Sequence, residues 1–182
     1  MHGSPSGQER PESREDHEKA FRDALPSLIR EAQEARDNAV NYRGFLVGCS
    51  VFAWDAKTRT YRSFSAGNMR PVKGPSPPTG RDKLCAERYA IEQAEKAGVT
   101  RILGIVTAST EQHTGKNVEG HKVLRPCEEC CQLIKDTPLI KPDSTFHGVH
   151  DDKPEQGGDA IVMDEEDMTI AQLLEEMASP DK

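Results

Sequence analysis

Two short cysteine-containing segments constrain this chain more than any other feature. The first is Cys85-Ala86-Glu87, and the second is Pro126-Cys127-Glu128-Glu129-Cys130, whose first cysteine comes 42 positions after Cys85. The chain has five cysteines, an odd number, and three of them are crowded between Cys127 and Cys131. In a reducing compartment this crowding indicates metal binding or thiolate chemistry more than disulfide bonding. A fold in which these thiols act together must bring the two segments to one place.

The spacing of the cysteines suits a zinc ion. Cys127 and Cys130 are three positions apart, so on a helix they share one face and can bind the same metal. Cys85, at the start of another predicted helix, would bring a third thiolate, and two helix N-termini would favour the anionic sulfurs. Three protein ligands leave one position of a tetrahedral zinc open for water, as in catalytic sites. The pattern therefore predicts one zinc ion per chain.

Glu87 lies two positions after Cys85. This spacing places a carboxylate beside the metal without making it a ligand, where it can accept a proton from water and pass it on. The alternatives are a structural zinc site and a redox pair. A structural site takes four protein ligands, and Cys131, His113 or His121 would have to supply the fourth.

Apolar periodicity and turn residues divide the chain into alternating helices and strands, which predicts an α/β sandwich. Asp82 is placed to cap the helix that begins at Cys85, and Gly98 to end it. Pro26 either starts the first main helix or kinks it. The predicted helices are 16–38, 85–97, 127–135 and 169–177, the strands are 44–54, 61–68, 101–109, 145–149 and 160–163, and the loops include 71–80, 110–122 and 151–159.

The composition is polar for a globular protein, with 35% apolar and 30% charged residues. We therefore expect one folded domain at 16–178 between disordered tails at 1–15 and 179–182. A net charge of −7 and an aromatic content of 5% disfavour a nucleic-acid partner and favour a small diffusible substrate. With no apolar run of about 18 residues and no signal peptide, we expect a cytoplasmic protein without a membrane partner.

The two cysteine segments fit the pattern of zinc-dependent nucleobase deaminases, in which Cys-x-Glu is followed by Pro-Cys-x-x-Cys. The segments LIREAQEARDNAV, NYRGFLVGCSVF, SAGN and TIAQLLEEM further resemble the opening helix, first two strands and last helix of the cytidine deaminase family. The resemblance extends over roughly residues 20–177. It implies a three-layer α/β/α sandwich with a mixed sheet of about five strands. It also implies a hydrolase that releases ammonia from an amino-bearing ring carbon.

The resemblance assigns roles to the residues of the two motifs. Cys85, Cys127 and Cys130 would hold the zinc ion. Glu87 would carry protons from water to the ring nitrogen and to the departing ammonia.

Four further residues receive roles from the resemblance, and three of them also have simpler explanations. Arg88 would offset the negative charge of three thiolates around a divalent ion, or it is an exposed helix residue. The backbone at Ala86 would contact the base. Asn68 would bind a sugar hydroxyl, or it is a turn residue after a strand. Phe45 would line the pocket, or it belongs to the core.

The chain departs from the family where the sugar would bind. The family has Asn-x-Glu, whereas this chain has Asn68-Met69-Arg70, so a cation replaces a carboxylate. The expected substrate is cytidine, deoxycytidine or a related aminopyrimidine nucleoside. A nucleotide, whose phosphate Arg70 or Lys73 would meet, and a nucleoside antibiotic are alternatives. A polynucleotide base deaminase and a non-catalytic zinc-binding relative rank lower. The resemblance also implies a homo-oligomer, either a dimer or a tetramer.

Overall fold

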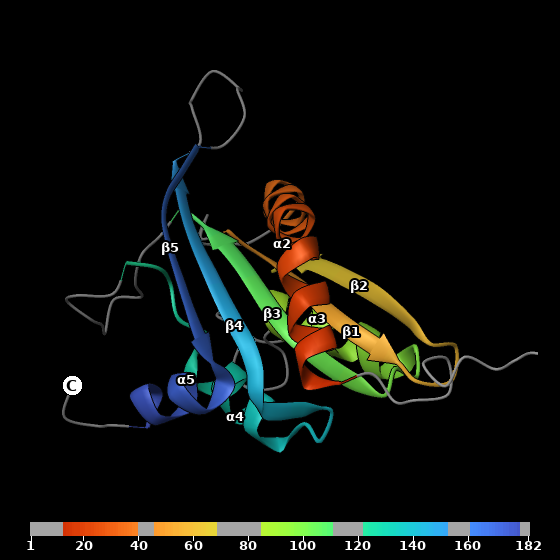
Figure 1. Cartoon of the computed structure of the whole chain (residues 1–182). Coiled ribbons are helices and arrows are strands. Elements are labelled where there is room, and N and C mark those ends of the chain that lie inside the picture. Colours follow the sequence, from red (N-terminus) through yellow and green to blue (C-terminus); the bar gives the residue numbers. More distant parts are fainter. Residues whose placement is uncertain (1–12, 40–45, 69–84, 111–121, 153–160, 179–182) are drawn as a thin grey trace, which may run out of the picture.

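The computed structural model describes residues 13–39, 46–68, 85–110, 122–152 and 161–178. They form one mixed five-stranded sheet with helices on both faces, as predicted (Figure 1). The sheet has the order β2-β1-β3-β4-β5, and only β3 and β4 pair in parallel. The strands are β1 (Val47–Asp55), β2 (Thr60–Gly67), β3 (Arg101–Ser109), β4 (Ile140–Asp152) and β5 (Ile161–Thr169), and the described helices are α2 (Arg14–Asp37), α3 (Ala86–Lys96), α4 (Glu128–Asp136) and α5 (Ile170–Met177).

Two hydrophobic cores lie on opposite faces of the sheet. Helix α2 covers one face, and its buried residues Phe21, Leu28 and Ala32 pack with side chains of β1, β3 and β4. Helices α3, α4 and α5 cover the other face, where Ile91, Ile134 and Leu173 are fully or almost fully buried. Both cysteine segments therefore lie on the same side of the sheet, opposite α2.

The prediction was closest around β3 and α3. Strand β3 occupies the predicted range 101–109, and α3 is one residue shorter at each end than predicted. The predicted cap is wrong: Cys85 and not Asp82 is the N-cap of α3, because the Cys85 carbonyl accepts the first helical hydrogen bond from the Tyr89 N–H. Asp82 itself lies outside the described residues. Gly98 follows the helix with a φ of 78°, a backbone conformation that favours glycine.

Helix α2 begins at Arg14, so the predicted tail 1–15 overlaps the helix by two residues. The cause is a capping box: the Asp16 N–H donates to Ser13 Oγ (3.0 Å), and the Ser13 N–H donates to Asp16 Oδ2 (3.2 Å). Pro26 lies inside the helix with an exposed side chain, so it does not start the helix.

The last two strands are longer than predicted from the sequence. Strand β4 covers 140–152 where only 145–149 was predicted, and β5 covers 161–169 where only 160–163 was predicted. The predicted loop 151–159 is thus wrong at its first two residues, and 153–160 lie outside the described part. Strand β5 is an edge strand that contains the acidic run Asp164–Asp167, and such a run does not show the apolar alternation that identifies strands.

The C-terminal half of α2 lies directly on the backbone of the sheet. A Cβ atom at Gly48 of β1 would be 1.7 Å from the Ala32 carbonyl oxygen, and one at Gly67 of β2 would be 2.3 Å from the Ala35 carbonyl oxygen. These contacts involve backbone atoms of the helix, which cannot rotate away. The helix can therefore dock at this depth only over glycine.

We expect Gly48→Ala to destabilise the protein by about 3 kcal/mol, the upper part of the range for overpacked cores, because the new methyl group must displace α2. Urea denaturation followed by circular dichroism measures the change. Ser50→Ala is the control, since Ser50 lies on the same face of β1 and its buried Oγ has no hydrogen-bond partner among the described residues. Equal stability of both variants would contradict the close docking of α2.

Candidate metal centre

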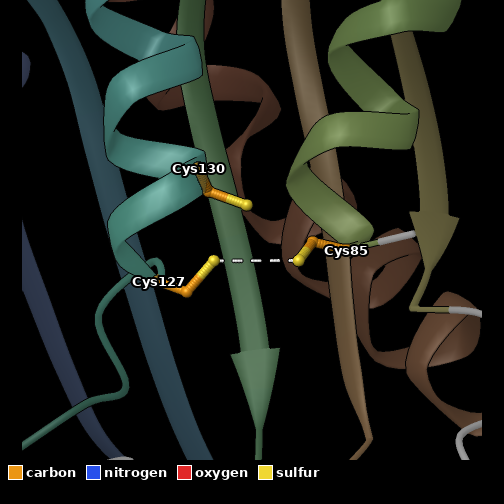
Figure 2. Close-up of side chains that lie close together, drawn as sticks. All are labelled: Cys85, Cys127 and Cys130. Carbon is orange, nitrogen blue, oxygen red and sulfur yellow. Dashed lines mark hydrogen bonds between the residues drawn. The ribbon is translucent and has the colours of Figure 1, made fainter. Parts of the chain in front are cut away.

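The structure brings three thiols from two helix N-termini together. Cys85 is the N-cap of α3, Cys127 is the N-cap of α4, and Cys130 lies in the first turn of α4. Their Sγ atoms all lie within 4.8 Å of one another, and the Cys85 and Cys127 sulfurs are 3.8 Å apart (Figure 2). Neither N-cap thiol makes a capping hydrogen bond to its own helix. Figure 2 shows the three side chains pointing toward one another across the space between the helices.

This arrangement fits a tetrahedral zinc ion. Zinc–thiolate bonds of about 2.3 Å place two ligand sulfurs about 3.8 Å apart, which is the spacing of Cys85 and Cys127. Two helix N-termini direct the positive ends of their dipoles at the sulfurs and favour their anionic form. Three ligands from the chain would leave one coordination position for a small molecule.

Two thiols of this cluster, Cys85 and Cys130, resist ionisation when no cation lies between them. Hydrogen bonding with Cys127 raises the pKa of Cys85 and of Cys130 well above the ordinary value of 9.0, and burial adds to the effect. A divalent cation would reverse this balance, since it favours the thiolate form. Metal binding would therefore release protons and strengthen as the pH rises.

Glu87 is buried beside the sulfurs. It lies in the first turn of α3 with 6% of its surface exposed. It is two residues from Cys85, and its negative charge contributes to the raised pKa values of Cys85 and Cys130. The chain has therefore buried an acidic side chain next to three thiols.

The other two cysteines lie near the cluster but outside it. The Cys131 thiol is directed toward the Pro126 carbonyl oxygen at 3.6 Å, and burial together with the Glu87 charge raises its pKa to about 12. Cys49 of β1 is completely buried, and burial together with the Glu87 charge raises its pKa. Neither belongs to the group of sulfurs within reach of one ion. Cys131 is thus not placed as a fourth ligand, while His113 and His121 lie outside the described residues.

The residues predicted to bind substrate are only partly described. Asn68 follows β2 with 8% exposure, and its Oδ1 accepts a hydrogen bond from the Val47 N–H at 2.9 Å. Its own N–H donates to the Val47 carbonyl at 3.0 Å, so Asn68 also closes the β1–β2 pairing. Ala86 is fully buried in the first turn of α3, and Arg88 is half-buried. Phe45 lies outside the described residues.

Sequence reasoning missed a buried ion network next to the second cysteine segment. Arg125, two residues before Cys127, has a side chain that is 3% exposed and bonds to Glu166 of β5 and Glu176 of α5. Burial tends to raise the pKa of Glu166, but hydrogen bonds from Arg125 and from the Lys122 N–H hold it below its ordinary value. The only sequence signal was the position of Arg125 beside the motif, because its partners lie about 40 and 50 residues away.

None of the described helices combines the length and apolar character needed to cross a lipid bilayer.

Comparison with known proteins identifies one family and several similar structures. The model described as the cytidine and deoxycytidylate deaminase zinc-binding region matches residues 23–141, which include Glu87 and all three clustered thiols. The structure of cytidine deaminase from Burkholderia pseudomallei is similar over 81% of this chain and 93% of that chain, with 20% identity and a TM-score of 0.52. The structure of cytidine deaminase from Mycobacterium leprae is similar over 82% of this chain and 96% of that chain, with 21% identity and a TM-score of 0.51. No curated protein matches the chain. At these identities the structural likeness concerns the fold alone.

Proposed function

Because the chain belongs to the cytidine and deoxycytidylate deaminase family, and is therefore a hydrolytic deaminase, we propose that it removes the amine of cytidine, deoxycytidine or a related aminopyrimidine nucleoside. One observation carries the proposal: three thiols converge at the N-termini of two helices, and a buried carboxylate lies beside them. A structural zinc site has no need of that carboxylate. A hydrolytic deaminase needs it, since water must lose a proton and ammonia must gain one.

Cys85, Cys127 and Cys130 would hold one zinc ion per chain. Bound there, zinc would supply a Lewis acid that lets water ionise near neutral pH. The chain contributes the trigonal set of sulfurs and the two helix N-termini that favour thiolates. Three thiolates around a divalent ion leave a net negative charge, and the guanidinium of the half-buried Arg88 would offset it.

Glu87 would move the protons. Its carboxylate accepts a proton from water, donates one to the ring nitrogen next to the amino-bearing carbon, and assists protonation of the leaving amine. Over the cycle one water is consumed, the ring carbon gains an oxygen and one ammonia is released. Burial suits this role, because a carboxylate shielded from bulk water exchanges protons with the substrate and not with solvent.

The remaining roles concern how the substrate is held. The backbone of Ala86 would contact the base, Phe45 would line the pocket, and Asn68 would bind a sugar hydroxyl. The hydrogen bond from the Val47 N–H orients the Asn68 carboxamide, which supports a role for its Nδ2 as the donor.

A deoxycytidylate-type nucleotide is the second candidate substrate, because the matching family model covers deaminases of both nucleosides and nucleotides. The Arg70 guanidinium, which takes the place of the family's carboxylate, would suit a phosphate. Arg70 lies outside the described residues.

We also propose, from the family resemblance, a cytoplasmic homo-oligomer. Light scattering after size-exclusion chromatography would test the oligomeric state.

Ammonia release measured across cytidine, deoxycytidine, their monophosphates and free cytosine tests the proposal. We expect turnover of at least one nucleoside or nucleotide and little turnover of the free base, which lacks the sugar that Asn68 would bind. Arg70→Glu should lower activity on monophosphates relative to nucleosides if phosphate is recognised there. Absence of ammonia from every compound, in protein that carries zinc, would contradict the proposed reaction.

A further inference from the structure

The segment that leads into the second cysteine motif is irregular and yet buried. Residues 122–126 form neither helix nor strand, but Val123 is fully buried and Leu124 and Arg125 are 8% and 5% exposed. Arg125 is joined to Cys127 through Pro126 alone. The position of Cys127 and Cys130 relative to Cys85 therefore depends on how this irregular segment is held.

Strand β4 supports the segment from below. A Cβ atom at Gly148 would be 2.6 Å from Val123 Cγ2, so Val123 rests directly on the backbone of the strand. The side chain of Glu166, on the neighbouring strand β5, binds the main chain of the segment. Glu166 Oε1 accepts hydrogen bonds from the N–H groups of Lys122 (2.8 Å) and Val123 (3.1 Å).

The Arg125 guanidinium completes the attachment. It donates to Glu166 Oε2 at 3.1 Å, to Glu176 Oε2 at 2.9 Å and to the Val123 carbonyl at 3.2 Å. One cation thus joins β5, α5 and its own segment, and both carboxylates are partly shielded from water, with 25% and 35% of their side-chain surfaces exposed.

Stability alone does not account for this network. Buried ion pairs are often no more stabilising than apolar side chains of the same volume, and their best-supported benefit is a single, well-defined geometry. Here the network fixes the backbone immediately before Cys127 and Cys130, which are two of the three clustered thiols. Outer residues that orient metal ligands act in this way in other metal centres.

We propose that Arg125, Glu166 and Glu176 form a clamp that positions Cys127 and Cys130 at the distance from Cys85 that a zinc ion requires. The inference rests on the proposed zinc centre and assigns Arg125 as a positioning residue for it. The C-terminal strand and helix thereby become part of the metal-binding apparatus, although they supply no ligand to the thiol cluster.

The test compares metal binding by the whole protein and by Arg125→Met, without substrate. Zinc affinity is measured by competition with a chromophoric chelator, and ligand geometry by the absorption spectrum of the cobalt-substituted protein. We expect zinc binding by Arg125→Met to weaken by about 10- to 100-fold, with altered cobalt bands. Arg125→Lys, which keeps the charge, should recover part of the affinity.

Arg36→Met is the matched control, because Arg36 is equally buried and is paired with the fully buried Asp151, but lies on α2 across the sheet. It should lose stability and keep the wild-type zinc affinity and cobalt spectrum. If Arg125→Met does not fold, Glu176→Gln removes one arm of the clamp at a partly exposed site and should weaken zinc binding several-fold.

Wild-type zinc affinity and an unchanged cobalt spectrum in folded Arg125→Met, or in Glu176→Gln if the former does not fold, would overturn the clamp. A wild-type protein that binds neither metal through its cysteines would instead refute the zinc centre itself. The two failures are therefore distinguishable.

Discussion

Cys127→Ala is expected to reduce the zinc content of the purified protein from about one ion per chain to almost none. The substitution removes one of three thiolates, and the cluster has no other sulfur within reach of the same ion among the described residues. Because binding to the folded state stabilises it, the variant should also melt at a lower temperature than the zinc-loaded wild type. Metal analysis by mass spectrometry and thermal denaturation with and without added zinc measure the two effects.

Cys131→Ala is the control for this substitution. Cys131 is a buried cysteine four positions after Cys127, in the helix whose N-cap is Cys127. Its sulfur faces the Pro126 carbonyl and not the cluster. This variant should keep its zinc. Full zinc content in Cys127→Ala, or loss of zinc in Cys131→Ala alone, would show that the ligands have been assigned wrongly.

Glu87→Gln is expected to lower kcat by about 10²- to 10⁴-fold while zinc and fold are retained. Glutamine keeps the size of the side chain but cannot accept and return a proton, so only the proton transfers are lost. Steady-state ammonia release on the best substrate, measured together with zinc content, separates this outcome from loss of metal.

Glu95→Gln, on the exposed surface of the same helix, is the matched control and should leave both activity and zinc content unchanged. Loss of zinc in Glu87→Gln would mean that Glu87 is a ligand. Wild-type activity in that variant would remove it from the reaction.

The elements that sequence reasoning placed best are those whose signals are local. Strand β3 is a continuous apolar run in the middle of the sheet, and its bounds were predicted without error. The pairing of Cys127 with Cys130 follows from their spacing at the start of one helix, whereas the approach of Cys85 from another helix was expected from the match to the deaminase pattern.

The elements that were missed depend on partners distant in sequence. Glu166 and Asp167 lie in an acidic run for which no helix or strand was predicted, yet in the structure they bind Arg125 and Arg22 from elsewhere in the chain. Hydrophobic periodicity does not indicate such ion pairs. The charged side chains of an edge strand can pair with oppositely charged side chains from segments that are far away in the sequence. The capping role of Cys85 was missed for the opposite reason: cysteine is not a favoured N-cap, and its thiol is used for another purpose.

The acidic run on β5 has a further consequence for how copies of this protein meet. An edge strand offers unpaired backbone groups that can recruit a second sheet and begin aggregation. Two copies joined antiparallel along β5, in a register centred on Asp164–Asp167, would set carboxylates of one chain opposite carboxylates of the other, and like charges across such a pair are destabilising. Pairing of two copies in that register is therefore disfavoured at neutral pH, where these carboxylates are ionised.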